Sequence, residues 1–173
     1  MKKVFVLLLV TFLTVSLFGC TNASSKKPVK KEPQRTETSQ KPNNAIVYHN
    51  TQYGFDFALP TSWKGYKIVA DKWEGVPIGG EKVVETGPMI SIRHPAWTAK
   101  IPRQDIPIMV FTLAQWKSLQ EEKFHIGAAP MGPSELGRNK NYVFALPARY
   151  NYAFPTGYKE VENILKTHPL TAK

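Results

Sequence analysis

Cysteine is almost absent from this sequence, which has 173 residues and a single thiol, at Cys20. One thiol cannot form an internal disulfide, a cysteine-rich zinc site or an iron–sulfur cluster, so these scaffolds are excluded. The four histidines are far apart in the chain, and no two of them have the short spacing of a local zinc motif. The glycine-rich phosphate loops of the Walker A and dinucleotide-binding types are also missing. The sequence therefore predicts neither a metal nor a cofactor.

A long hydrophobic run is missing as well. The most apolar segment, residues 4–18, is uncharged and follows a short positive start at Lys2 and Lys3. A membrane-spanning helix needs about 20 apolar residues, so this segment is short for a span. Its length and flanking charge are typical of the apolar region of a secretory signal.

The apolar segment ends at Leu17-Phe18-Gly19-Cys20. This ending resembles the lipobox of bacterial lipoproteins, in which an aliphatic residue, a variable residue and a small residue precede the modified cysteine. The resemblance implies a lipid on the Cys20 sulfur, removal of the signal peptide at residues 1–19, and anchoring at the outer face of the cell membrane. The alternative is a plain signal peptide or an uncleaved anchor in which Cys20 has no role.

The next segment, residues 20–44, is polar and basic. After Cys20 it contains six Lys and Arg against two Glu, three prolines and very few apolar side chains. Such a segment cannot bury enough apolar surface to offset its ordering entropy, so we interpret it as a disordered tether. Its charge either attracts an anionic leaflet or keeps the tether soluble and extended. We expect no nucleic-acid partner, because no folded element accompanies this charge.

Residues 45–173 are long enough for one core, and here the pattern predicts mainly strands. Tyr53, Phe55, Phe57 and Leu59 alternate with smaller or polar residues, which is typical of a half-buried strand. We expect one α+β domain with a mainly antiparallel sheet and about two flanking helices. The predicted strands and helices are listed by range: strands over 45–50, 53–59, 66–69, 82–86, 89–94, 106–112 and 142–146, and helices over 113–123 and 156–167.

Two local features refine this prediction. The strands over 82–86 and 89–94 should form a hairpin across Gly87-Pro88, because these residue types favour turns. In the last helix, Thr156 follows Pro155 and is the expected N-cap.

Three stretches carry a resemblance to a known family. They are Asn50–Gly65, with the pattern Tyr-Gly-Phe, a β-run, Pro, two residues and Trp, then Ile90–Pro95 and Tyr150–Gly157. Over residues 45–170 the chain resembles an uncharacterised family of bacterial lipoproteins, and its opening resembles the PsbP/Mog1-type fold. The resemblance implies an antiparallel sheet with flanking helices, and it brings no established activity.

The densest polar and aromatic cluster contains Arg93, His94, Trp97 and Arg103. Arginine and tryptophan in a loop held by prolines are a recurrent binding surface. The alternative is a structural loop that packs against the domain, in which Trp97 fills a gap in the packing and Arg103 pairs with Asp105.

A second cluster, residues 149–154, contains Tyr150 and Tyr152. Its alternating aromatics either pack against the last helix or form a stacking platform for a sugar or a peptide.

Catalytic motifs are not convincing in this sequence. Ser91, His94 and Asp105 have the residue types of a hydrolase triad, but Ser91 and His94 lie three apart on an expected strand and face opposite sides. We therefore assign no catalytic residue. We expect a lipid-anchored binding module for an envelope protein, a peptide or a wall component. The alternatives are a surface hydrolase that uses distant residues such as His94 and Asp105, and a structural subunit of an envelope complex.

Overall fold

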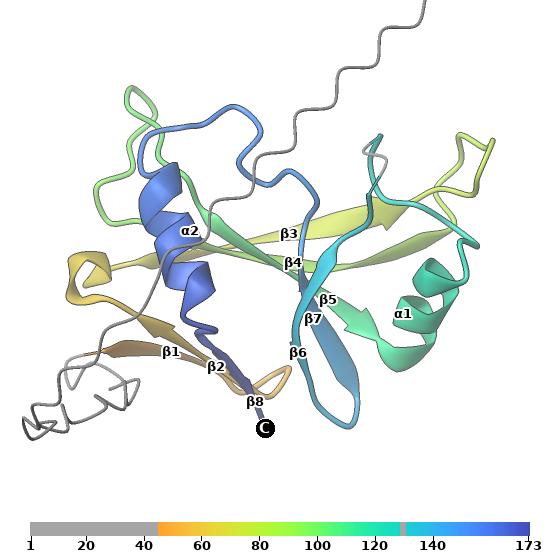
Figure 1. The fold of residues 1–173 in the computed structure, drawn as a ribbon, viewed down its shortest axis with the longest axis horizontal. Coiled ribbons are helices and arrows are strands. Elements are labelled where there is room, and N and C mark those ends of the chain that lie inside the picture. Colours follow the sequence, from red (N-terminus) through yellow and green to blue (C-terminus); the bar gives the residue numbers. More distant parts are fainter. Residues whose placement is uncertain (1–44, 129–130) are drawn as a thin grey trace, which may run out of the picture. The chain divides into compact units, whose positions relative to one another are not determined.

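The computed structural model describes residues 45–128 and 131–173. The predicted signal peptide (1–19) and tether (20–44) lie outside the described residues. The described part of the chain contains eight strands and two α-helices, and every strand pairing is antiparallel (Figure 1). The predicted α+β class, with one domain made mainly of antiparallel sheet, is confirmed. Within the described ranges, no helix is long and apolar enough to cross a membrane.

The smaller sheet has three strands in the order β1-β2-β8, namely β1 (Ile46–Asn50), β2 (Phe55–Leu59) and β8 (Leu170–Ala172). The predicted alternation holds, since Phe55, Phe57 and Leu59 of β2 are fully buried. Pro60 follows the strand, as expected of a residue that cannot donate to a ladder. β8 was not predicted, and it joins the end of the chain to β2.

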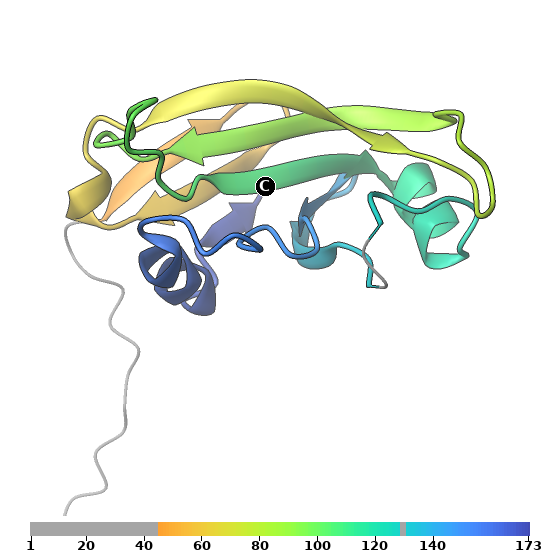
Figure 2. The same cartoon turned by 90° about the horizontal axis from the view of Figure 1, so that it is seen from above.

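The larger sheet has five strands in the order β3-β4-β5-β7-β6. Figure 2 shows β3, β4 and β5 running side by side. The bounds of the strands are β3 (Lys67–Gly75), β4 (Glu85–Arg93), β5 (Ile106–Thr112), β6 (Ser134–Arg138) and β7 (Tyr142–Leu146). The predicted bounds of β5 are confirmed, as is the predicted strand at 142–146.

Both faces of the larger sheet carry a core. Ile106, Ile108 and Val110 of β5 point into a cluster shared with β2 and α2, whereas Met109 and Phe111 point into a second cluster. The period of two in a strand explains this division. β5 is therefore buried on both sides, and the first cluster lies between the two sheets.

Two helices flank the sheets. α1 (Leu113–Gln120) begins with a capping box between Thr112 and Gln115, and its Trp116 and Leu119 are buried in the second cluster. α2 (Tyr158–Lys166) adds Val161 and Ile164 to the first cluster. Figure 1 shows α2 beside the small sheet and α1 at the other end of the large one.

The predicted hairpin at Gly87-Pro88 is wrong, because β4 runs without interruption from Glu85 to Arg93. Gly87 pairs with Trp73, and a side chain at position 87 would meet the indole ring at 2.6 Å. Glycine is thus required for close packing rather than for a turn. Pro88 lies where β5 no longer pairs with β4, so one side of the strand has no ladder at that point. The turn is instead at residues 76–84.

The predicted N-cap of α2 is also wrong. Gly157 occupies that position with φ +85°, and Thr156 makes no side-chain cap. The Thr156 carbonyl accepts a hydrogen bond from the Gln104 N–H at 2.9 Å, so this residue binds the loop that contains Gln104. A Cβ at Gly157 would lie 3.0 Å from the Arg103 guanidinium, so both the backbone conformation and the space favour glycine.

Candidate functional site

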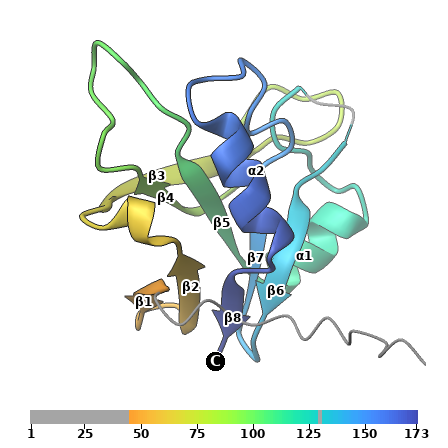
Figure 3. The same cartoon turned by 60° about the vertical axis from the view of Figure 1, so that its left-hand side comes forward.

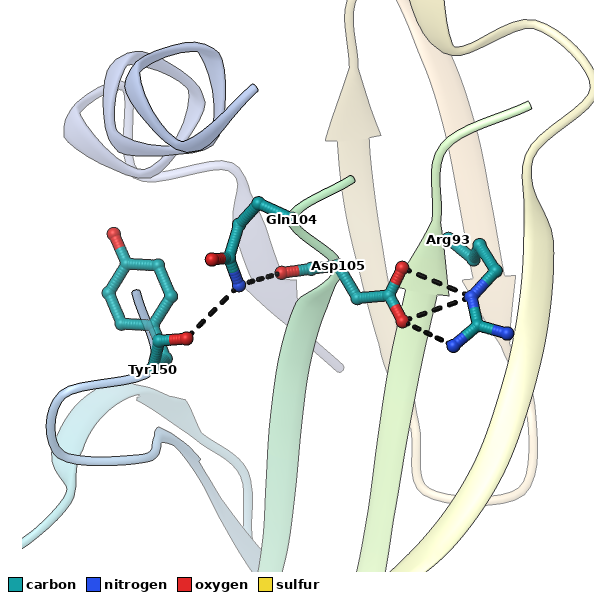
Figure 4. Close-up of polar contacts among 4 residues, drawn as sticks. All are labelled: Arg93, Gln104, Asp105 and Tyr150. Atoms are coloured by element: carbon teal, nitrogen blue, oxygen red, sulfur yellow. Dashed lines mark hydrogen bonds and ion pairs between the residues drawn. The ribbon is translucent and has the colours of Figure 1, made fainter. Parts of the chain in front are cut away.

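Two loops meet at the N-terminal end of α2, namely residues 94–105 after β4 and residues 147–157 after β7. The views in Figures 1 and 3 agree that both loops lie at this end of the domain. A parallel bridge joins Arg103 to Thr156, and the Gln104 side-chain amide donates to the Tyr150 carbonyl at 3.2 Å (Figure 4). Sequence reasoning placed candidate residues in both loops, and the structure brings the two loops together.

Asp105 anchors the first loop to β4. The Arg93 guanidinium donates to the Asp105 carboxylate through Nε and Nη2, with the shortest contact at 2.7 Å (Figure 4). The hydrogen bonds to this carboxylate raise the pKa of Arg93, so the guanidinium stays charged. The Trp97 ring lies 4.1 Å from the same guanidinium carbon, which is a cation–π distance. The first loop is therefore fixed at both of its ends, because Arg93 precedes it and Asp105 closes it.

The pairing of Arg103 with Asp105 is wrong, because Arg103 pairs with Glu160 of α2 at 3.4 Å. Glu160 also accepts hydrogen bonds from the Ser62 hydroxyl at 2.8 Å and from the Trp63 indole N–H at 3.2 Å. One carboxylate thus ties the first loop, the turn after β2 and the second helix together. Glu160 could not be recognised from the sequence as the partner of Arg103, since 57 residues separate the two.

His94 lies under this network and is 9% exposed. Its ring meets the Trp63 ring edge-on, with the centroids 5.0 Å apart. The Nδ1 atom accepts the Ala96 backbone N–H at 3.0 Å, which assigns the proton of the neutral ring to Nε2. Burial lowers the pKa of His94 from its ordinary value of 6.5, the nearby Arg103 charge lowers it further, and Glu160 opposes both. The neutral ring is therefore the form that fits the fold.

This environment predicts a pH dependence of stability. The unfolded chain binds a proton at a higher pH than folded His94 does, so the free energy of unfolding should fall as the pH drops below about 6.5. His94→Asn keeps an acceptor for the Ala96 N–H and cannot titrate, so its stability should change less over this range. Urea unfolding between pH of about 7.5 and 5.5 measures the difference and stays above the range in which carboxylates titrate.

The matched control is His168→Asn, because His168 is exposed and its φ of +50° suits asparagine. This variant should keep the pH dependence of the parent chain. Equal pH dependence in the parent and in His94→Asn would contradict the assignment.

Apolar side chains project from both loops into solvent. Ile101 is 62% exposed, Tyr152 74% and Phe154 66%. Tyr150 behaves differently, since it packs partly buried against the first core cluster. Packing against the core thus holds for Tyr150 and not for Tyr152. Ile101, Tyr152 and Phe154 are called the two-loop face below. The sequence analysis missed Ile101, although an isoleucine in a polar, proline-rich loop is a signal that could have found it.

The residues considered for catalysis do not converge. Asp105 is engaged by Arg93, and His94 accepts from the Ala96 backbone, while Ser91 lies within β4. Among residues 45–128 and 131–173, no three His, Cys, Asp or Glu side chains gather in a group that could hold a metal ion.

An open pocket of about 350 Å³ lies between α2, β6 and β8, and Tyr150 of the second loop is among its lining residues. Its floor is apolar, with Leu136, Leu165 and Leu170, and its polar lining includes Glu162 and His168. Glu162 already accepts a hydrogen bond from the Asn151 amide at 2.7 Å. The pocket contains neither His94 nor Asp105, so it does not assemble the residues that a hydrolase was expected to use.

Comparison with known proteins adds no assignment to this geometry. No protein-family model matches the chain, no curated protein matches it, and no solved structure matches it. The resemblance to bacterial lipoproteins and to the PsbP/Mog1-type fold therefore stays a prediction.

Proposed function

We propose that the chain is a membrane-anchored, extracytoplasmic lipoprotein whose domain is a binding module for a component of the cell envelope. The observation that carries the binding role is the two-loop face, on which three large apolar side chains stand more than half exposed. Exposed apolar groups on loops that are themselves held rigidly are typical of interaction sites. The ion pairs of Arg93 and Arg103 supply that rigidity.

The anchor part of the proposal rests on the lipobox-like sequence at Leu17-Phe18-Gly19-Cys20. Mass spectrometry of the chain from its native host should find a mature protein that starts at Cys20 and carries a glycerolipid on sulfur. Cys20→Ser should leave the precursor uncleaved or release the protein from the membrane, because the acyl chains hold it there. Unchanged mass and unchanged membrane retention in Cys20→Ser would contradict the anchor.

Site-specific photo-cross-linking in intact cells tests the binding role. A benzoylphenylalanine that replaces Tyr152 should form adducts with one envelope component, because this side chain is 74% exposed. The same probe at Lys117 is the control, since that side chain is 77% exposed and belongs to α1, which lies at the other end of the large sheet from α2 (Figure 1).

The outcome depends on the contrast between these positions. Adducts at Tyr152 that are lost in the Phe154→Asn background support the two-loop face, and asparagine suits the φ of +46° at that position. Equal adducts at both positions, or turnover of a wall substrate by the purified chain without any adduct, would overturn the binding role in favour of another class.

A further inference from the structure

We propose that the two-loop face docks on the anionic lipid surface of a membrane. The proposal rests on the proposed function and names the partner of the same face. Its first support is the kind of side chain at the loop tips. Ile101, Tyr152 and Phe154 are apolar or amphipathic, and aromatic rings of this kind favour the boundary between lipid headgroups and acyl chains.

Local contacts hold the tips of both loops in place. Thr98 and Ile101 exchange backbone hydrogen bonds at 3.2 and 3.1 Å, which closes a tight turn and leaves Ile101 exposed at its end. In the other loop, Phe154 packs edge-on against Tyr158 of α2, with the centroids 5.2 Å apart. Neither tip needs to reorganise to expose its apolar group, so little ordering entropy is lost on docking.

Charge complementarity is the second support. Lys100 and Arg149 lie in the same two loops, and Lys159 lies in the first turn of α2; all three are exposed. In the described part of the chain, no acidic side chain forms an ion pair with any of them. Each Lys or Arg near an anionic leaflet strengthens binding about fivefold, so these three cations together should raise the affinity for anionic lipid about a hundredfold.

The acidic side chains of this region all have hydrogen-bonding partners. Asp105 is held by Arg93, Glu160 by Arg103, and Glu162 by the Asn151 amide. The two arginines offset the charges of Asp105 and Glu160, which reduces the repulsion of anionic lipid, whereas the partner of Glu162 is a neutral amide. The surface that remains combines apolar tips with unpaired cations, which suits a bilayer better than a polyanion without apolar groups.

The anchor sequence permits this orientation. Twenty-five residues separate Cys20 from β1. Their full reach is about 80 Å, whereas a domain of this length is about 30 to 40 Å across. Any face of the domain could therefore contact the membrane that holds the lipid. Which face does so depends on the apolar and charged side chains exposed on the domain.

Vesicle binding without the anchor tests the proposal. Residues 45–173 contain all the described strands and helices together with both core clusters, so this fragment is suitable. It should sediment with vesicles of equal parts phosphatidylcholine and phosphatidylglycerol, and much less with phosphatidylcholine alone. Added salt should release it, because screening weakens attraction to the anionic headgroups.

Variants identify the face. Lys100→Gln, Arg149→Asn and Lys159→Gln together should lower the partition coefficient about a hundredfold, which is about fivefold for each charge. Asparagine at Arg149 suits its φ of +54°. The control removes the same charge elsewhere on the exposed surface, through Lys82→Gln, Lys140→Gln and Lys166→Gln, and should have a much smaller effect.

The apolar tips have their own pair of variants. Phe154→Asn should lower partition about tenfold because the ring no longer leaves water. Ile78→Ser removes another exposed apolar side chain, 66% exposed and on the turn between β3 and β4, and should leave partition unchanged. Far-UV circular dichroism of each variant shows that the fold is retained.

Two results would overturn the lipid proposal. The first is no binding to anionic vesicles, whether or not an anionic wall polymer is bound, and the second is equal loss of binding in the face and control variants. If adducts at Tyr152 to a protein or a glycan persist in cells, the binding role stands and the lipid partner is wrong. If vesicle binding and adducts are both absent, the proposed function fails as well.

Discussion

Trp73→Ala should lower the free energy of unfolding of the domain by about 3 to 5 kcal/mol. Trp73 is 3% exposed and stacks on Phe111 with the centroids 4.4 Å apart. Its indole N–H also donates to the Val110 carbonyl at 2.9 Å, which the variant would leave without this partner. The loss combines a large cavity with an unsatisfied acceptor, and urea denaturation followed by circular dichroism measures it.

Two further variants separate these contributions. Trp73→Phe keeps an aromatic ring against Phe111 but loses the hydrogen bond, so its cost should be clearly smaller. Trp97→Ala removes the same kind of side chain from a half-buried position and should also cost much less. If Trp73→Ala destabilises the domain no more than Trp97→Ala, the second face of the large sheet is not a packed core.

Glu160→Ala has the second-largest expected effect, about 2 kcal/mol of destabilisation. Glu160 accepts from Ser62, Trp63 and Arg103, and its removal leaves the Arg103 guanidinium without an acidic partner. The Arg103 Nε atom is already buried without a hydrogen bond, so this side chain has few alternatives. Both side chains keep some contact with solvent, at 22% and 32% exposed, which limits the cost.

A double-mutant cycle isolates the ion pair. Replacing both partners, as Arg103→Leu with Glu160→Leu, should cost less than the sum of the single changes, because no charge is left alone. Glu162→Gln is the matched control, since this carboxylate accepts one hydrogen bond, from Asn151. Additive single effects, or equal costs in Glu160→Ala and Glu162→Gln, would contradict the organising role of Glu160.

The sequence was informative where local pattern and burial coincide. β5 combines β-branched residues with burial on both faces, and both of its ends were predicted. The alternation in β2 was also recognisable, because period and residue type agree there.

Other elements depend on tertiary partners. β6 contains Gly137 and a register shift after Glu135, so its residues show no clean alternation. β8 has three residues and is a strand because it pairs with β2. Gly87 resembled a turn residue, although its role is to make room for Trp73. Short, irregular or closely packed elements of this kind carry little local signal.

The candidate site shows the same limit. The aromatic and basic residues of both loops were recognised, because such residues are unusual in loops. Their geometry was not, since Arg93 takes Asp105 and Arg103 reaches across to α2. The pairing of charged groups across distant segments depends on how the loops fold onto the helix. It cannot be predicted from the spacing of the residues in the sequence.

Occupancy of the two-loop face in cells tests the central claim most directly. Cys20 is the one natural thiol and is expected to carry lipid, so introduced cysteines can be labelled selectively with a maleimide. With Ile101→Cys, Tyr152→Cys and Phe154→Cys, labelling of the full chain on intact cells should be much slower than labelling of the detergent-solubilised protein. Lys117→Cys and Lys140→Cys should label equally fast in both states. Equally fast labelling of the loop positions in cells and in detergent would show a free face and contradict the account.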